Sequence, residues 1–126
     1  MITASRHSFL AAVKGHVDVV KLLLEEDHVD PKLQDNYGSS PLLEAAKGGH
    51  VDVVKLLLEK DHVDLNLQDK SGQTPLSWAA ENGCDLIVEL LLQRDNIDLN
   101  LQDTLGRTPI SQAAESRHKK SFQLLL

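Results

Sequence analysis

The stretch GHVDVVKLLLEEDHVD at residues 15–30 returns 34 residues later as GHVDVVKLLLEKDHVD at residues 49–64. The two copies differ only where Glu26 is replaced by Lys60. A period in the thirties indicates a stack of structural units in which each unit contacts only its neighbours. We therefore expect a repeat array rather than one globular core.

A second motif follows the same period. It reads LQDNYGSSPLLEAA from Leu33, LQDKSGQTPLSWAA from Leu67 and LQDTLGRTPISQAA from Leu101. The length of 126 residues suits a single domain. We expect this domain, residues 1–126, to contain four units with a truncated last one, and we place them at about 1–34, 35–68, 69–102 and 103–126.

The third unit shows most clearly what each unit should look like. Residues 69–73 predict a turn in which Gly72 supplies a positive φ. Thr74 is a predicted helix N-cap, and Pro75 stands at the first helical position, where its missing N–H does no harm. A second helix is predicted from about residue 85 to 93 by apolar residues at helical spacing. The pattern predicts an all-α fold in which each unit is a turn followed by two short helices.

The pattern D-x-x-G-x-T-P-L-x-x-A-A followed by G-H-x-x-V-V-x-L-L-L resembles the ankyrin repeat. The turn motif matches in the last three units and the Gly-His motif in the first two. The resemblance implies an ankyrin-like helical repeat solenoid whose turns project as a row of short β-hairpin fingers. It also implies a protein–protein interaction module that binds through the finger tips and the concave face of the first helices.

The last unit departs from this pattern. Arg117 stands where the other units have glycine, and Ser121 stands where Val53 and Ile87 stand in the units before it. We interpret this polar drift as a terminal unit that faces water. Residues 124–126 are three leucines with no predicted cap, so we expect a monomer that is able to self-associate through this uncapped end.

Charge and composition exclude several functions. The net charge of −6 disfavours nucleic acid and anionic membranes, which both attract Lys and Arg. The single cysteine, Cys84, excludes a disulfide within the chain and favours a cytoplasmic or nuclear location. His16 and His50 are separated by a full repeat, so they are not expected to converge on a metal. We expect no enzymatic activity, no catalytic residues, no metal and no cofactor.

Positions that vary between the units are the candidate binding surface, because variation within one chain marks positions that the fold leaves free. They are Asn36, Tyr37, Ser39, Lys70, Ser71, Gln73, Thr104, Leu105 and Arg107 in the turns, and Glu44, Lys47, Trp78, Glu81, Asn82, Gln112 and Glu115 on the first helices.

Two aromatic residues in this set leave alternatives open. Tyr37 is either an exposed binding anchor or a side chain folded against its own finger, and Trp78 is either an anchor or packed against a neighbouring unit. The two middle units carry net charges of −3 and −4. We therefore expect another protein with a basic or mixed patch as the partner. The alternative function is a structural spacer or self-associating segment of a larger protein.

Overall fold

The computed structural model describes residues 13–25, 34–60 and 63–126, and within these ranges it contains helices and no β-strand. The beginning of the predicted first unit lies outside them. The helices are α2 (Val17–Glu25), α3 (Pro41–Gly48), α4 (Val51–Leu58), α5 (Pro75–Asn82), α6 (Asp85–Leu92), α7 (Pro109–Glu115) and α8 (Lys119–Leu125).

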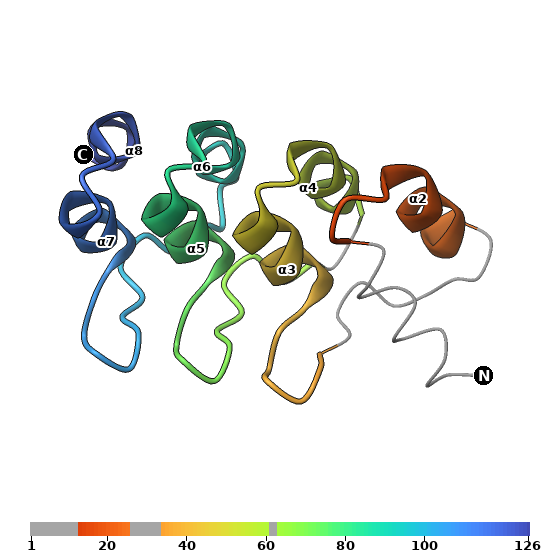
Figure 1. The fold of residues 1–126 in the computed structure, drawn as a ribbon, viewed down its shortest axis with the longest axis horizontal. Coiled ribbons are helices and arrows are strands. Elements are labelled where there is room, and N and C mark those ends of the chain that lie inside the picture. The colour runs from red at the N-terminus through yellow and green to blue at the C-terminus, as the bar shows by residue number, and fades with distance from the viewer. Residues whose placement is uncertain (1–12, 26–33, 61–62) are drawn as a thin grey trace.

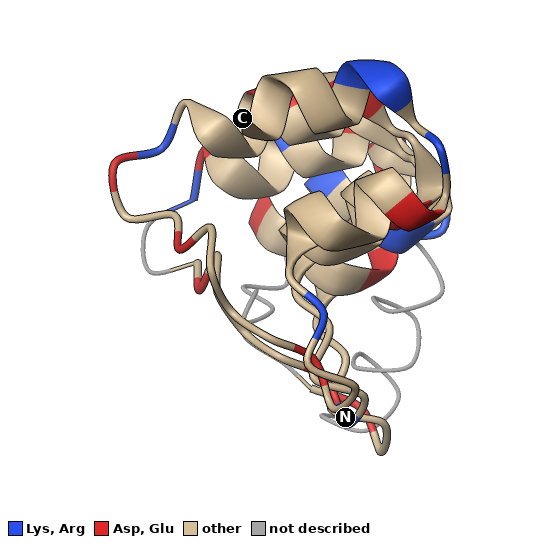
Figure 2. Cartoon of the chain, turned by 90° about the vertical axis from the view of Figure 1, so that its left-hand side faces the viewer, with Lys and Arg blue, Asp and Glu red and all other residues tan. Residues whose placement is uncertain are grey.

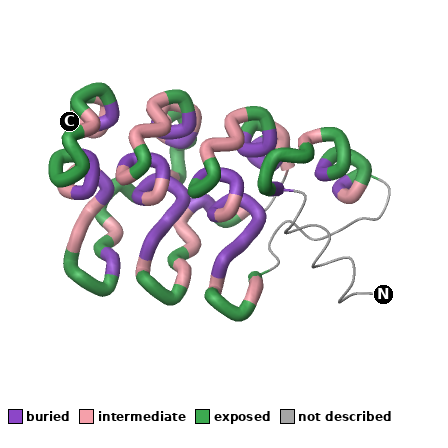
Figure 3. The backbone as a smooth tube through the Cα atoms, in the orientation of Figure 1, coloured by how far each residue is buried: buried purple, intermediate pink, exposed green. Residues whose placement is uncertain are grey.

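The helices are arranged in two rows. α3, α5 and α7 lie side by side, and α2, α4, α6 and α8 form a second row beside them (Figure 1). The interior between the rows is aliphatic, with side chains such as Leu42, Leu76 and Ile87 at most 1% exposed. Figure 3 shows the buried positions on the sides of the helices that face their neighbours. The small residues that allow close approach are fully buried at Ala45, Ala46, Ala79, Ala80 and Ala113.

The first helices begin and end as the sequence predicts. The Thr74 hydroxyl accepts a hydrogen bond from the Ser77 N–H, and the Ser77 hydroxyl accepts one from the Thr74 N–H, which completes a capping box. Pro75 occupies the first turn, and Gly83, with a φ of 71°, caps the C-terminal end of α5. The predicted cap at Thr74 is confirmed, as is the positive φ of Gly72 at 78°.

The expected β-hairpins are absent from the described residues. Each finger, defined here as residues 35–39, 69–73 or 103–107, is a tight turn closed by a backbone hydrogen bond such as Asp69 N–H to Gln73 O at 2.9 Å. The turn is too short for two strands to pair within it. The backbone instead bonds to the next finger, because the Lys70 N–H donates to Tyr37 O at 3.0 Å and Thr104 repeats this contact.

The interpretation of Ser121 as a water-facing position is wrong. Its side chain is fully buried, and its hydroxyl donates a hydrogen bond to Asp85 Oδ1 at 2.5 Å. The equivalent residues Val53 and Ile87 are also buried, at 1% and 0% exposure. A hydroxyl replaces an aliphatic contact here because the preceding unit supplies a carboxylate to receive it.

Arg117 adopts a left-handed backbone with a φ of 60°, where the equivalent residues Gly49 and Gly83 have φ of 74° and 71°. A side chain in this region costs about 1 kcal/mol compared with glycine. We expect Arg117→Gly to raise the free energy of unfolding by about that amount in a denaturant titration. Ser116→Gly is the control, because Ser116 has a φ of −86°. A gain in the control but not at Arg117 would contradict this account.

Candidate functional site

An aspartate at the base of each finger fixes the shape of the turn. One carboxylate oxygen accepts hydrogen bonds from the backbone N–H groups two and four residues later, at 2.8 to 3.0 Å. The three aspartates are Asp35, Asp69 and Asp103. These bonds, with those between adjacent fingers, hold the finger tips in defined positions.

The finger tips expose large apolar side chains. Tyr37 is 75% exposed and Leu105 is 76% exposed, which rules out a Tyr37 folded against its own finger. Ser71 holds the equivalent position on the middle finger and is also exposed. The other exposed positions of the predicted tips are Asn36, Lys70 and Thr104. Exposed apolar side chains on a fixed backbone are typical of binding surfaces.

Trp78 connects a finger to two first helices. Its indole N–H donates a hydrogen bond to Asp69 Oδ2 at 3.0 Å. The ammonium group of Lys47 on α3 lies 4.6 Å from the centre of its ring, within the range of a cation–π contact. The side chain is half-buried. Trp78 therefore packs against a neighbouring unit, as one of the two interpretations predicts. Part of its side chain stays accessible, and its role as a binding anchor stays a prediction.

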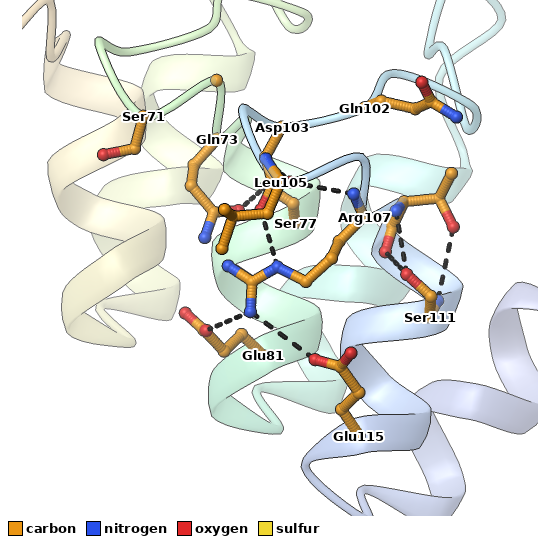
Figure 4. A network of polar contacts seen from close by, with 12 residues as sticks. Ser71, Gln73, Ser77, Glu81, Gln102, Asp103, Leu105, Arg107, Ser111 and Glu115 are labelled. Carbon is orange, nitrogen blue, oxygen red and sulfur yellow. Dashed lines mark hydrogen bonds and ion pairs between the residues drawn. The ribbon is translucent and has the colours of Figure 1, made fainter.

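Arg107 is the centre of an ionic network on the last finger (Figure 4). Its Nε lies 2.8 Å from Asp103 Oδ2, and its Nη1 lies 3.5 Å from Glu115 and 3.9 Å from Glu81. Burial opposes the charged form of Asp103, but hydrogen bonds from Arg107 and Leu105 outweigh it and lower the pKa of the carboxyl. The hydrogen bond to Asp103 raises the pKa of Arg107 in turn.

The lowered pKa of Asp103 predicts a loss of stability in acid. A carboxyl with a folded pKa below its unfolded value stabilises the fold above the unfolded pKa, about 3.9, and this contribution is lost as pH falls through the folded pKa. In unfolding titrations, Asp103→Asn should therefore be less stable than the parent by a constant amount above about pH 5, and the gap should narrow below about pH 4. Asp95→Asn, at an exposed position, controls for the lost charge. A gap that is unchanged at low pH would contradict the prediction.

The family comparison agrees with the geometry. The family described as Ankyrin repeats (3 copies) matches residues 8–103 and 61–126. The chain belongs to the ankyrin repeat family. Ankyrin repeats are generally protein–protein interaction modules without enzymatic activity. A comparison with curated proteins finds no significant match.

Three residues of the predicted ankyrin binding surface are buried rather than exposed. Ser39 is 6% exposed, because its backbone closes the base of the first described finger. Gln73 is 3% exposed, and its side-chain carbonyl accepts a hydrogen bond from the Ser77 hydroxyl at 2.6 Å. Gln112 is 1% exposed. The expected exposure is wrong at all three, and variation between the units reflects local packing there.

Gln112 is also unusual in its hydrogen bonding. Neither Oε1 nor Nε2 of its buried amide has a partner within the described part of the chain. An unpaired buried polar group costs about 1–3 kcal/mol, and methionine has nearly the same shape without the polar atoms. We expect Gln112→Met to raise the free energy of unfolding by about 1–2 kcal/mol in a denaturant titration. Gln123→Met, at an exposed position of α8, should give no such gain. Equal stability of the Gln112 variant and the parent would contradict this.

The remaining positions of the predicted binding surface lie on the first helices of the units, α3, α5 and α7. Lys47, Asn82 and Glu115 are exposed, while Glu44 and Glu81 are half-buried. The side-chain amide of Asn82 donates a hydrogen bond to the Lys47 carbonyl at 3.0 Å and so links α5 to α3. Lys47 contacts the Trp78 ring, and Glu81 and Glu115 contact Arg107.

Sequence reasoning missed the role of the finger aspartates. The signal was present, because the triplet Leu-Gln-Asp recurs unchanged at Asp35, Asp69 and Asp103 while the tips vary. The described residues contain no group of histidine, cysteine, aspartate or glutamate side chains placed to hold a metal ion. Among the helices that the structure describes, none is long and apolar enough to cross a membrane.

Proposed function

We propose that this chain forms a single array of four units that binds a partner protein through its finger tips and the concave face of its first helices. The observation that carries the proposal is the exposure of Tyr37 and Leu105 on turns held rigid by carboxylate and backbone hydrogen bonds. A large apolar side chain on such a turn loses little conformational freedom when it binds. Tyr37 and Leu105 are the proposed anchors.

The proposed surface consists of the predicted positions that are exposed or half-buried. They are Asn36, Tyr37, Glu44, Lys47, Lys70, Ser71, Trp78, Glu81, Asn82, Thr104, Leu105, Arg107 and Glu115.

The charges of this surface support a partner with a basic or mixed patch. Glu81 and Glu115 share one guanidinium, that of Arg107, at 3.9 and 3.5 Å. At these distances Arg107 holds the two carboxylates only weakly, so a lysine or arginine of the partner could pair with them. Exposed charges of this kind steer the encounter, so the association rate should fall as salt rises.

A peptide selection tests the proposal. The whole chain is used as bait for a random peptide library, and the affinity of the recovered peptides is measured for the parent and for Tyr37→Ala and Leu105→Ala. Each substitution should cost about 1–3 kcal/mol of binding. Lys21→Ala and Lys55→Ala, at exposed positions of the second helices, are the controls and should change little.

Two results would contradict the proposal. One is the recovery of no peptide above background, which a structural spacer would give. The other is peptide binding that is lost in the Lys21 and Lys55 variants but unaffected at Tyr37 and Leu105. Circular dichroism of each variant would show that the fold is retained.

A further inference from the structure

The ring of Trp78 is held in a fixed orientation on α5. Its indole N–H donates a hydrogen bond to Asp69 Oδ2 at 3.0 Å. Asp69 is itself held in place, because its Oδ1 accepts hydrogen bonds from two backbone N–H groups of its own finger. The neighbouring helix α3 is joined to α5 by the hydrogen bond from the Asn82 amide to the Lys47 carbonyl at 3.0 Å. Trp78 therefore presents an aromatic ring in a defined position, and part of the side chain is accessible.

A cation already lies against this ring. The ammonium group of Lys47 is 4.6 Å from the ring centre. Lys47 is exposed, and it makes no ion pair with a carboxylate among the described residues. A cation–π contact at an exposed position is weak, and an ammonium group is strongly hydrated, so it gives up favourable contacts with water to reach the ring. The ring thus accepts a cation, and no ion pair holds Lys47 there.

An arginine side chain suits this ring better than a lysine side chain does. The guanidinium group is planar, stacks on aromatic faces and is more weakly hydrated than an ammonium group. When its face lies on a ring, the N–H groups at its edge remain free to donate hydrogen bonds to carboxylates. An arginine from another protein would therefore compete well with Lys47 for the ring of Trp78.

Carboxylates are placed to complete such an exchange. Glu81 follows Trp78 by three residues on α5, a spacing that brings the two side chains to the same side of the helix. This carboxylate already lies near one guanidinium, since Arg107 Nη1 is 3.9 Å from Glu81 Oε1 (Figure 4). Glu44 precedes Lys47 by three residues on α3, and it has no ion pair within the described ranges. Lys47 would therefore have a carboxylate available once it leaves the ring.

The ring occurs at one place in the array. The residues at the positions equivalent to Trp78 are Leu10, Glu44 and Gln112. The two middle units carry net charges of −3 and −4. Figure 2, a view from the end of α7 and α8, shows acidic positions on both the helices and the fingers. A cationic side chain is therefore attracted to the middle of the array, and one aromatic ring there defines where it binds.

We propose that Trp78 receives an arginine side chain of the partner protein, which replaces Lys47 on the ring and pairs with Glu81. This inference rests on the proposed function, because it names the partner residue that the first helices bind. Lys47 is an internal occupant that the arginine displaces. A lysine of the partner gains less, because it exchanges one ammonium group for another.

The test titrates the whole chain with N-acetyl-arginine-N-methylamide and with the citrulline analogue, which has the same shape without the charge. Trp78 is the only tryptophan of the chain, so its fluorescence reports on the site directly. At constant ionic strength, the arginine compound should give a saturable change in emission with a Kd on the order of 10 mM. The citrulline analogue should bind at least about tenfold more weakly.

Two variants with matched controls examine the neighbours of the ring. Lys47→Gln removes the internal cation and should strengthen binding of the arginine compound about two- to fivefold. Its control is Lys55→Gln, which removes the same charge at an exposed position of α4 and should change binding less than about 1.5-fold. Glu81→Gln should weaken binding about two- to fivefold, whereas Glu59→Gln, at an exposed position, should change it little. Circular dichroism shows that each variant keeps the fold.

Several results would overturn the inference. They are equal binding of the arginine and citrulline compounds, a change in emission that does not saturate, and an effect of Lys47→Gln or Glu81→Gln that is no larger than that of its control. Tyr37→Ala should leave the titration unchanged, so the two proposals fail separately. Peptides that depend on Tyr37 and Leu105, together with no binding of the arginine compound, would support the finger tips and contradict the arginine site.

Discussion

Replacing Gly72 with alanine is expected to lower the free energy of unfolding by about 3 kcal/mol. Gly72 has a φ of 78°, where a side chain costs about 1 kcal/mol. The added Cβ would also lie 2.7 Å from Asp103 Cα and 2.8 Å from Thr104 N. Both atoms belong to the backbone of the next finger, so the clash cannot be relieved by rotating a side chain and adds about 2 kcal/mol.

Gly106 provides the matched control for this prediction. It has the same φ of 78° at the equivalent position of the next finger, but a Cβ there would meet nothing within 4 Å. Gly106→Ala should therefore cost only the strain, about 1 kcal/mol. Denaturant titrations of the two variants separate strain from the contact between fingers. Equal losses would mean that the fingers are not packed as closely as the structure shows.

The sequence predicts the local structure of the array well because its caps and turns are decided within a few residues. Thr74, Pro75, Gly72 and Gly83 each act through their own backbone conformation or one nearby hydrogen bond. The family resemblance predicts the stacking, and the contacts between helices of successive units confirm it. The predicted strands of the fingers are not found in the described residues, where each finger is a tight turn closed by one backbone hydrogen bond.

The candidate surface is harder to predict because exposure depends on neighbours that are distant in the sequence. Arg107 is equivalent to Gln73, yet Gln73 is 3% exposed whereas Arg107 is half-buried and reaches Glu81 on α5 of the preceding unit. Position 112 is filled by glutamine where a neighbouring unit has Trp78, and nothing in the local sequence indicates its burial. Such differences arise between units, so a pattern within one unit cannot reveal them.

Asp69→Asn is expected to lower the free energy of unfolding by about 2 kcal/mol. The carboxylate accepts hydrogen bonds from the Ser71 and Gln73 N–H groups through Oδ1, and from the Trp78 indole N–H through Oδ2. An asparagine oxygen is able to keep the two backbone bonds. Its amide nitrogen would then point a donor at the indole donor, so a charge-assisted bond is replaced by a repulsive contact.

A double-mutant cycle with Trp78→Phe isolates this contact. Phenylalanine removes the indole donor, so Asp69→Asn in that background should cost about 1 kcal/mol less than in the parent. Asp35→Asn is the comparison at the equivalent position, where the described hydrogen bonds are those of Oδ1 with Tyr37 and Ser39, and it should cost less than Asp69→Asn. Equal costs of Asp69→Asn with and without Trp78 would show that the indole bond contributes nothing. Trp78 would then be held by its contact with Lys47, and its orientation on the proposed binding surface would not depend on the finger.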